Sequence, residues 1–324
     1  MKWMLDVPVL PSPQKISYED KILFMGSCFS QEIGSKLKAL KFNVLQNPNG
    51  ILYDPVSLSE ALVSYMVNKK YIQTGLVKIN ELWHSWQHHS SFSDEDHQEV
   101  LSHINSSQDA AHGFISSVDW LVISLGTAFH YLLAKENIPV VNCHKAPSSF
   151  FTKELLTISE IEESLEKAIA MITAALPKVH IILTVSPVRH IRDGIVENNH
   201  SKARLLEAVH KLTSKFPNVE YFPAYEIMMD ELRDYRFYKK DLVHPNEMAT
   251  QYIFEKFTES YIAGKDVVCM ESITEILNAV QHTPLHEASE GYAVFKKNQL
   301  EKIARLQQQF HAIDLSAEMR HFSG

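Results

Sequence analysis

The sequence contains little cysteine, which limits the kinds of site that we expect. Only 3 of its 324 residues are cysteines, and Cys28, Cys143 and Cys269 lie far apart. An odd number at such spacing supports neither a disulfide framework nor a C-x-x-C zinc or redox site. We therefore expect each thiol to be reduced, so a reactive one must owe its reactivity to its surroundings.

Long apolar runs and an excess of basic charge are also absent. No segment is apolar for long enough to span a bilayer, and Asp6 and three prolines interrupt the apolar run at the N-terminus. We therefore expect a cytoplasmic protein without a signal peptide. Lys and Arg total 31 against 39 for Asp and Glu, a formal net charge of −8. This balance predicts neither a nucleic acid nor a membrane as a partner.

Apolar runs typical of strands alternate with segments of helical periodicity along most of the chain. After the apolar run at 21–25, for example, Ile33, Leu37 and Leu40 recur at helical spacing. The alternation predicts an α/β fold, a doubly wound and mostly parallel sheet with helices on both faces. Strands are predicted at 21–25, 42–46, 119–126, 179–187 and 218–224, short β-like runs at 128–134 and 138–142, and further helices at 55–67, 95–116, 159–176 and 201–214.

Two segments depart from this alternation. Residues 71–93 are rich in Trp, His and Ser, with partial alternation, and we expect an inserted hairpin or long loop there. From about residue 248 the pattern is helical. Helices are expected at 248–262, 272–280 and 292–310. We accordingly divide the chain into an α/β domain at 1–262 and a helical C-terminal extension at 263–324.

The turn Gly26-Ser27-Cys28 follows the first predicted strand and opens a helix. In a doubly wound sheet the ligand crevice lies at the carboxyl ends of the strands, so a nucleophile here would face it. A helix N-terminus also favours thiolate over thiol, which makes Cys28 a candidate nucleophile. The alternative is a structural turn, in which Ser27 or Ser30 caps the helix and Cys28 is buried.

A second candidate feature lies after the last predicted strand, in the run Asp241-Leu242-Val243-His244-Pro245. An Asp three residues before a His on a short turn can accept a hydrogen bond from one ring nitrogen and leave the other facing a nucleophile. Acyl transfer needs such a base and such an orienting group. Capping of the following helix by Asp241 or His244 would explain the same pattern.

Several longer motifs accompany these two turns, in order along the chain to about Tyr252. They are GSCFS at 26–30, NPNGILYDP at 47–55, LGTAF at 125–129, NCHK at 142–145, TVSPVRH at 184–190, NNHSKA at 198–203 and RDYRFYKKDLVHPN at 233–246. With these motifs the chain resembles the GSCFA domain family, a bacterial group similar to the SGNH (GDSL-type) hydrolases. The resemblance implies a three-layer, SGNH/flavodoxin-like sandwich and an esterase-like activity.

The resemblance also implies roles for particular residues. Cys28 stands where GDSL hydrolases have the nucleophilic serine, and Ser27, one residue away, is the alternative nucleophile. His244 would act as the base, and Asp241 would orient it. Gly50 resembles the oxyanion-hole glycine that follows the second strand.

The third family block, Gly-x-Asn-Asp, corresponds to the run of four residues that begins at Gly126, and its Asn is absent here. A donor of that kind contributes about 3 to 4 kcal/mol to transition-state stabilisation, so ordinary SGNH hydrolysis requires a substitute. Asn142, His144 and His190 are the candidates for that substitute.

Three functions are compatible with these motifs. The first is a hydrolase or acyltransferase that acts on an acyl ester or thioester, including an acylated carbohydrate, through a covalent acyl intermediate and without a cofactor or metal. The second is an inactive SGNH-fold protein that binds a glycan or a partner, which the missing Asn and the unusual Cys favour. The third is a metal-dependent hydrolase that uses the histidines of 84–97, although their spacing fits no compact zinc pattern.

Aromatic residues interleave with histidines in the insertion at 71–93. This composition is typical of a loop that covers a pocket. We therefore expect the insertion to border the crevice, with Trp83, His84 and Trp86 influencing which substrate enters.

Overall fold

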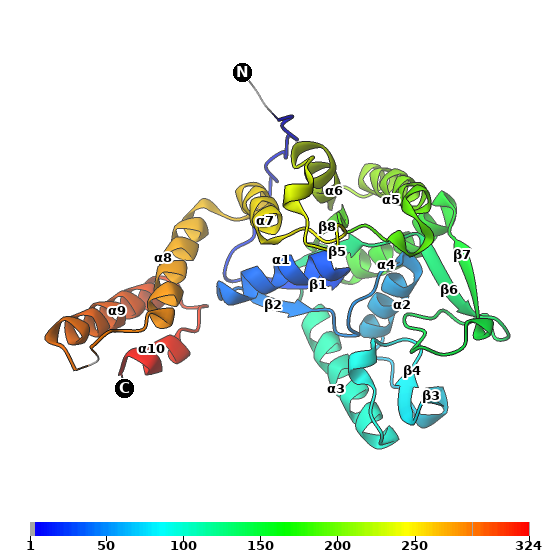
Figure 1. The fold of residues 1–324 in the computed structure, drawn as a ribbon, viewed down its shortest axis with the longest axis horizontal. Helices are drawn as coiled ribbons and strands as arrows, with labels where there is room; N and C mark the ends of the chain where they lie inside the picture. Colours follow the sequence, from blue (N-terminus) through cyan, green and yellow to red (C-terminus); the bar gives the residue numbers. More distant parts are fainter. Residues whose placement is uncertain (1–3, 287, 324) are drawn as a thin grey trace.

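The structure is a computed structural model that describes residues 4–286 and 288–323. Its centre is a five-stranded parallel sheet in the order β2-β1-β5-β8-β9 (Figure 1). This confirms the predicted α/β fold, and the strand order is that of flavodoxin-like sheets. The strands are β1 (Lys21–Gly26), β2 (Asn43–Gln46), β5 (Trp120–Leu125), β8 (His180–Val185) and β9 (Val219–Tyr221).

Helices cover both faces of this sheet, so the strands are buried on both sides. Successive residues of β1 alternate between the two faces, with Leu23 in one hydrophobic cluster and Phe24 in the other. The Phe24 cluster includes α1 and α7, and the Leu23 cluster includes α2, α3, α4 and α5. The helices are α1 (Cys28–Ala39), α2 (Pro55–Met66), α3 (His97–Ile115), α4 (Ile158–Ala175), α5 (Ile195–Lys215) and α7 (Glu247–Tyr261).

The register of the sheet brings the turns that follow its central strands to the same edge. Gly26 of β1 pairs with Ser124 of β5, and Ser124 pairs with Thr184 of β8. The carboxyl ends of these three strands therefore lie side by side, where a doubly wound fold has its ligand crevice.

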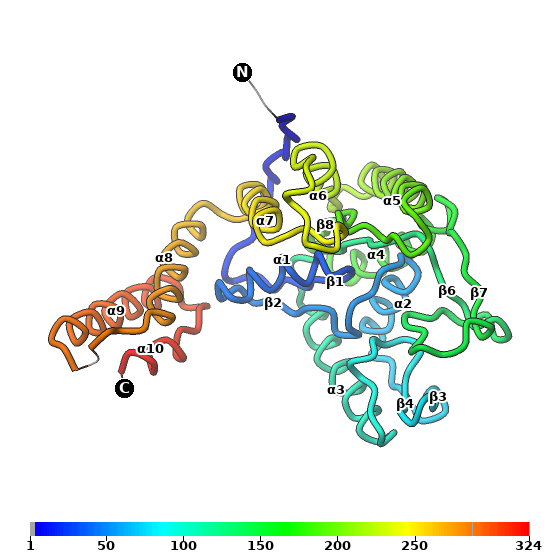
Figure 2. Tube along the Cα trace, viewed as in Figure 1, coloured from blue at the N-terminus to red at the C-terminus, as the bar shows by residue number. Residues whose placement is uncertain are grey.

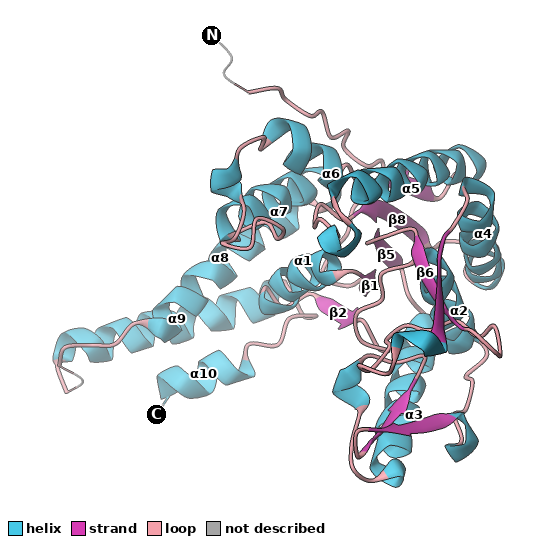
Figure 3. Ribbon diagram, turned by 45° about the vertical axis from the view of Figure 1, so that its right-hand side comes forward, coloured by secondary structure: helices cyan, strands magenta, loops and turns pink. Residues whose placement is uncertain are grey.

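Two small antiparallel hairpins lie outside the main sheet (Figure 3). The predicted insertion contains β3 (Leu76–Ile79) and β4 (Leu82–Ser85), which pair with each other. The second hairpin joins β6 (Phe129–Leu133) to β7 (Phe151–Leu155). The expected β-like run at 138–142 forms no strand of its own, but Pro139 bridges Leu132 and two backbone hydrogen bonds join Ile138 and Val140 to β6.

Helix α5 begins at Ile195, six residues before the start expected from its apolar pattern. Its first turns are polar, but Asn198, Ser201 and Lys202 are buried there, so tertiary contacts stabilise a segment that amphipathic periodicity does not mark. The remaining short elements are η1 (Gln73–Gly75), η2 (Ser90–Phe92), η3 (Ser148–Phe150), η4 (Ile191–Asp193), α6 (Ala224–Glu226), η5 (Ile227–Glu231) and η6 (Tyr235–Phe237).

The C-terminal part is helical, as predicted, with α8 (Gly264–Gln281), α9 (Glu290–Gln309) and α10 (Ser316–Ser323). Helix α8 is longer than expected, and α10 was not expected. Phe310 lies in the hydrophobic cluster that covers one face of the sheet, with its ring centroid 5.8 Å from that of Tyr18. We retain the division at residue 262 as a proposal about the domains, with the two parts joined through this shared cluster.

The N-terminal segment crosses to the end of α7 before it enters β1, as the tube in Figure 2 shows. The backbone N–H groups of Ser12 and Ile16 donate to the carbonyls of Ser260 and Tyr261, 2.9 and 2.7 Å away. Within the described ranges, no helix combines the length and the apolar character needed to cross a bilayer.

Candidate active site at the carboxyl edge of the sheet

The turn between β1 and α1 separates the roles of Ser27 and Cys28. Gly26 has a φ of +123°, and a Cβ at this position would overlap the carbonyl oxygen of Ser124, so the turn requires glycine. The Ser27 side chain is 2% exposed, accepts a hydrogen bond from the N–H of Phe29, and lies 2.9 Å from the Ser124 hydroxyl. Cys28 is the first residue of α1 and is partly exposed. The accessible side chain of this turn is therefore the Cys28 thiol, while Ser27 caps the helix.

Tyr53 lies beside this thiol, and sequence reasoning did not identify it. Its hydroxyl oxygen is 3.6 Å from the Sγ of Cys28. Burial, together with the neighbouring Cys28, raises the pKa of Tyr53 well above its usual value, so the hydroxyl keeps its proton and can donate to a thiolate. The motif NPNGILYDP contained this residue, but only the fold brings it to α1.

The two glycines expected at the oxyanion hole already use their amides within the fold. The N–H of Gly50 donates to the carbonyl of Asn47 at 2.7 Å, and that of Gly126 donates to the carbonyl of Tyr53 at 2.8 Å. A Cβ on Gly126 would press against the Tyr53 ring, and a Cβ on Gly50 would overlap His89. These glycines allow close packing at the carboxyl edge of the sheet, and in this structure neither amide is free to bind an oxyanion.

The predicted contact between Asp241 and His244 is present. Oδ2 of Asp241 lies 2.8 Å from Nδ1 of His244, while its Oδ1 accepts hydrogen bonds from the N–H groups of Val243 and His244. These backbone hydrogen bonds, followed by the one to the His244 ring, lower the pKa of Asp241 to about 2. Asp241 is therefore a carboxylate at neutral pH, and it leaves Nε2 of the ring available to another group.

Long-range contacts place this loop between α1 and the segment after β8. The carbonyl of Val243 accepts a hydrogen bond from the N–H of Arg189 at 3.3 Å. On the other side, the Nζ of Lys239 lies 3.8 Å from Oε1 of Glu32, which is on the first turns of α1. The loop that carries His244 thus lies beside α1, and among the described residues no hydrogen bond joins His244 to Cys28.

Lys202 is a second residue that sequence reasoning missed, although the motif NNHSKA contained it. Its side chain is 1% exposed, and its Nζ donates to the carbonyls of Gly126 at 2.7 Å and Ser186 at 2.6 Å. These carbonyls follow β5 and β8, so one ammonium group joins two of the turns at the crevice. Burial lowers the pKa of Lys202 to about 7.

The three candidate substitutes for the missing Asn have other contacts in the structure. Oδ1 of Asn142 accepts from the N–H of His144, whose Nε2 lies 2.9 Å from the carbonyl of Ser85 in the insertion. Burial lowers the pKa of His144 to about 4, which keeps its ring neutral at pH 7. The N–H of His190 donates to Oδ1 of Asn198, and burial lowers the pKa of its ring as well. No contact described here joins these three residues to the turn at Cys28.

The insertion packs directly on the turn at Gly50. The N–H of His89 donates to the carbonyl of Asn49 at 2.9 Å, and the carbonyl of Trp86 accepts from the N–H of Val141 at 2.8 Å. Other ring side chains of the insertion contact residues of the insertion itself or of α3. Both ring nitrogens of His84 are hydrogen-bonded, to Ser93 and to the carbonyl of Ile79.

Trp83 packs in a small cluster with Phe92, Val100 and Ile104 of the insertion and α3. Trp83 and His84 therefore stabilise the insertion, and Trp86 is the remaining candidate for contact with a substrate. Among the residues that the structure describes, no three His, Cys, Asp or Glu side chains form a group that could hold a metal ion.

Comparisons with known proteins place the chain in a family. Among solved structures, it is distantly similar to a protein assigned as a platelet activating factor from Streptococcus pneumonia, at 14% identity and a TM-score of 0.39, over 74% of this chain and 83% of that one. It is also distantly similar to an acetyl xylan esterase (Est2A) from Butyrivibrio proteoclasticus, at 12% identity and a TM-score of 0.38, over 79% of this chain and 64% of that one. No curated protein matches the sequence. Residues 273–323 match the C-terminal domain of GSCFA domain proteins, and residues 21–257 match the GSCFA family itself. This chain is therefore a member of the GSCFA family.

Proposed function

We propose that this protein is an SGNH-like hydrolase or acyltransferase that acts on an acyl ester or thioester, with an acylated carbohydrate as the substrate class we favour. The observation that carries the proposal is the Asp241–His244 contact of 2.8 Å, on a loop beside the helix that begins at Cys28. An imidazole fixed through Nδ1 by a carboxylate presents Nε2 as a base, which is the arrangement that activates a serine or cysteine nucleophile.

In the proposed reaction, the sulfur of Cys28 attacks the acyl carbon while His244 takes the thiol proton. The tetrahedral intermediate collapses, the bond to the leaving alcohol or thiol breaks, and His244 returns the proton to that leaving group. The resulting thioester on Cys28 is then attacked by water or by an acceptor alcohol. His244 accepts the proton of this second nucleophile, and the Cys28 thiolate departs and is reprotonated.

Tyr53 supports the thiolate in this proposal. Its protonated hydroxyl, 3.6 Å from Sγ, is a hydrogen-bond donor to the anion, and the N-terminus of α1 adds the positive end of the helix dipole. The variant Tyr53→Phe keeps the ring that packs on Gly126 and removes only the donor. We expect it to slow reaction of Cys28 with an alkylating reagent while leaving the fold intact.

Asn47 is the donor that we propose in place of the missing family Asn. Its Oδ1 accepts the N–H of Gly26 at 2.8 Å, two residues before Cys28. Its Nδ2 is buried and has no hydrogen-bond partner among the described residues. A buried amide N–H without a partner costs free energy. A hydrogen bond from this Nδ2 to an acceptor that appears only during the reaction would therefore be favourable.

A panel of p-nitrophenyl esters, acyl thioesters and acetylated sugars tests the proposal. We expect Cys28→Ala and His244→Ala each to lower turnover by about a thousandfold or more, because the two residues act as a unit. Ser27→Ala is the matched control in the same turn, and we expect it to keep activity at some cost in stability. Activity that survives in Cys28→Ala but is lost in Ser27→Ala would contradict the assignment of the nucleophile.

The alternative function, a binding protein without catalysis, predicts a different outcome from the same panel. The engaged amide of Gly50 favours it, because it removes the donor that the family resemblance implies at this glycine. Absence of turnover on every ester and thioester, with tight binding of an acylated sugar by the wild type, would replace the proposed enzyme with this alternative.

A further inference from the structure

A groove of about 670 Å³ lies beside α2, and neither Cys28 nor His244 lines it. Its walls come from α2, α4 and the β6 hairpin, which stand next to one another in Figure 3. Such a volume accommodates a small organic molecule. The groove therefore needs an explanation separate from the proposed catalytic site.

One polar residue that lines the groove, His130, pairs with the buried Asp54, which does not line the groove itself. Nδ1 of His130 lies 2.9 Å from Oδ1 of Asp54, and both side chains are almost fully buried. Burial alone would lower the pKa of His130, but the hydrogen bond and the charge of Asp54 outweigh it and raise that pKa. Asp54 also caps α2 by accepting the N–H of Ser57. His130 is thus fixed in orientation, with Nε2 as the ring nitrogen available to a ligand.

Two further polar groups lie on the same face of α2, one turn apart. Ser57 is 3% exposed, and its Oγ has no hydrogen-bond partner among the described residues. Glu60 lines the groove three residues later, and burial raises the pKa of its carboxyl. An unpartnered hydroxyl and a partly desolvated carboxyl next to an open groove are groups that a ligand would satisfy.

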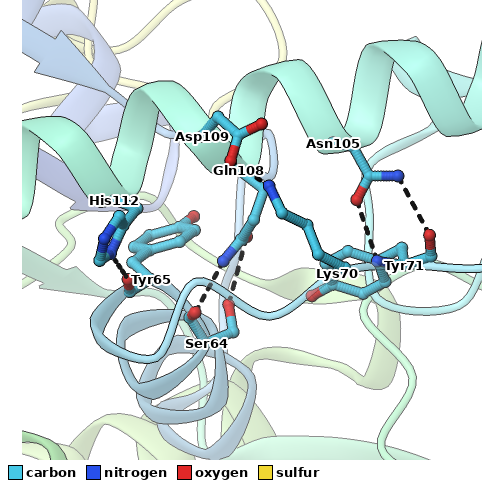
Figure 4. Close-up of polar contacts among 8 residues, drawn as sticks. All are labelled: Ser64, Tyr65, Lys70, Tyr71, Asn105, Gln108, Asp109 and His112. Carbon is cyan, nitrogen blue, oxygen red and sulfur yellow. Dashed lines mark hydrogen bonds and ion pairs between the residues drawn. The ribbon is translucent and has the colours of Figure 1, made fainter.

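The wall that carries Tyr71 is held rigidly by α3 (Figure 4). The side chain of Asn105 accepts the N–H of Tyr71 at 2.9 Å and donates to its carbonyl at 3.0 Å. One turn further on, Gln108 donates to the carbonyl of Ser64 at 2.7 Å, and Lys70 pairs with Asp109. The groove is therefore preformed, which lowers the entropic cost of binding.

The charged and apolar side chains that line the groove indicate which class of ligand fits it. The charge of a protonated His130 is offset by Asp54, and the other charged side chains of the groove are three carboxylates and two ammonium groups, so the groove does not favour an anion. They are Glu60, Glu160, Glu163, Lys69 and Lys167. Apolar side chains such as Val63, Leu132 and Val141 fill the spaces between them. A neutral molecule with many hydroxyl groups and an apolar ring face matches both features.

We propose that this groove is a binding site for a neutral mono- or disaccharide, whose hydroxyls bind Nε2 of His130, the Glu60 carboxyl and Oγ of Ser57. The site is distinct from the proposed catalytic turn, although Asp54 is adjacent in sequence to Tyr53, whose hydroxyl contacts Cys28. Binding therefore does not depend on turnover.

The test measures binding to the Cys28→Ala protein, so that its outcome is independent of the proposed activity. The probes are D-glucose, N-acetyl-D-glucosamine, maltose and xylobiose, followed by saturation-transfer NMR and calorimetry, with acetate and inorganic phosphate as charged probes. We expect at least one sugar to bind with a Kd of about 1 mM or lower, and neither anion to compete.

Variants locate the bound sugar. Glu60→Gln removes the carboxylate but keeps the shape, and Val63→Phe fills the groove; we expect each to weaken binding about tenfold or more. Glu162→Gln, on α4 but outside the groove, is the matched control and should bind as before. The proposal is overturned if no sugar binds, if the anions bind in preference, or if both groove variants bind like the control.

Discussion

Replacement of Lys202 by Met tests whether the buried side-chain nitrogen of Lys202 joins the turns that follow β5 and β8. The variant keeps the length and packing of the aliphatic chain and removes the donor to the carbonyls of Gly126 and Ser186. Each carbonyl left without a partner costs about 1 to 3 kcal/mol. Below pH 7 this loss is partly offset, because the variant also avoids burying a charge.

The destabilisation of Lys202→Met above pH 7 follows from the pKa of Lys202, which burial lowers from 10.5 to about 7. Between these values the folded protein has released the proton and the unfolded chain still holds it. The free energy of unfolding of the wild type therefore rises with pH, by about 1.4 kcal/mol per unit, or about 2 to 3 kcal/mol between pH 7 and pH 9. Lys202→Met lacks this contribution, so its destabilisation relative to the wild type should grow by the same amount.

Urea unfolding followed by tryptophan fluorescence at pH 6, 7, 8 and 9 measures this difference, since the chain contains 4 Trp residues. Lys211→Met is the control, because Lys211 is on the same helix but is exposed. Its stability should remain parallel to that of the wild type across the whole range. Parallel curves for Lys202→Met as well would refute the reasoning, because Lys202 would then titrate alike in the folded and unfolded states.

Three other predictions concern the crevice. Iodoacetamide at neutral pH should label Cys28 first, because burial raises the pKa of Cys143 and raises that of Cys269 to about 11; faster labelling of either, mapped by mass spectrometry, would contradict a reactive Cys28. Asp241→Asn should lower turnover by about a hundredfold or more with a nearly unchanged melting temperature at pH 7. Because the side chain of Asp241 is exposed, the stabilising contribution of its lowered pKa is small; it is complete above about pH 4 and is lost as the pH falls toward 2, so the variant should be slightly less sensitive to acid in that window. Trp86→Ala should change which acyl esters are used and not the rate-limiting chemistry; an unaltered substrate profile would show that Trp86 only packs against His144 and Phe151.

Much of the fold could be predicted from the sequence because its signals are local. The five strands of the sheet and the helices between them follow from periodicity and from the residues that begin and end each element. The Asp241–His244 contact could be predicted for the same reason, since three residues of a tight turn bring the two side chains together whatever the rest of the chain does. The cap formed by Ser27 is equally local, and it was one of the two alternatives for that turn.

The pairing of β6 with β7 could not be predicted in this way. The two strands are joined by a long connection, and the nearer run at 138–142 is just as apolar. Both segments hydrogen-bond to β6, β7 along its whole length and 138–140 through one bridge and two hydrogen bonds, and periodicity in a single segment does not reveal which of them forms the ladder.

The chemical surroundings of the site depend even more on tertiary structure. Tyr53 lies 25 residues from Cys28, and Lys202 lies 76 residues from Gly126. A sequence specifies which side chains carry a hydroxyl, a thiol or an amine, and whether a short turn can join two of them. The loss of water around Lys202, the use of the Gly50 and Gly126 amides within the fold and the proton kept on Tyr53 arise only when distant segments pack together, because pKa values and free hydrogen-bond donors are properties of a packed environment.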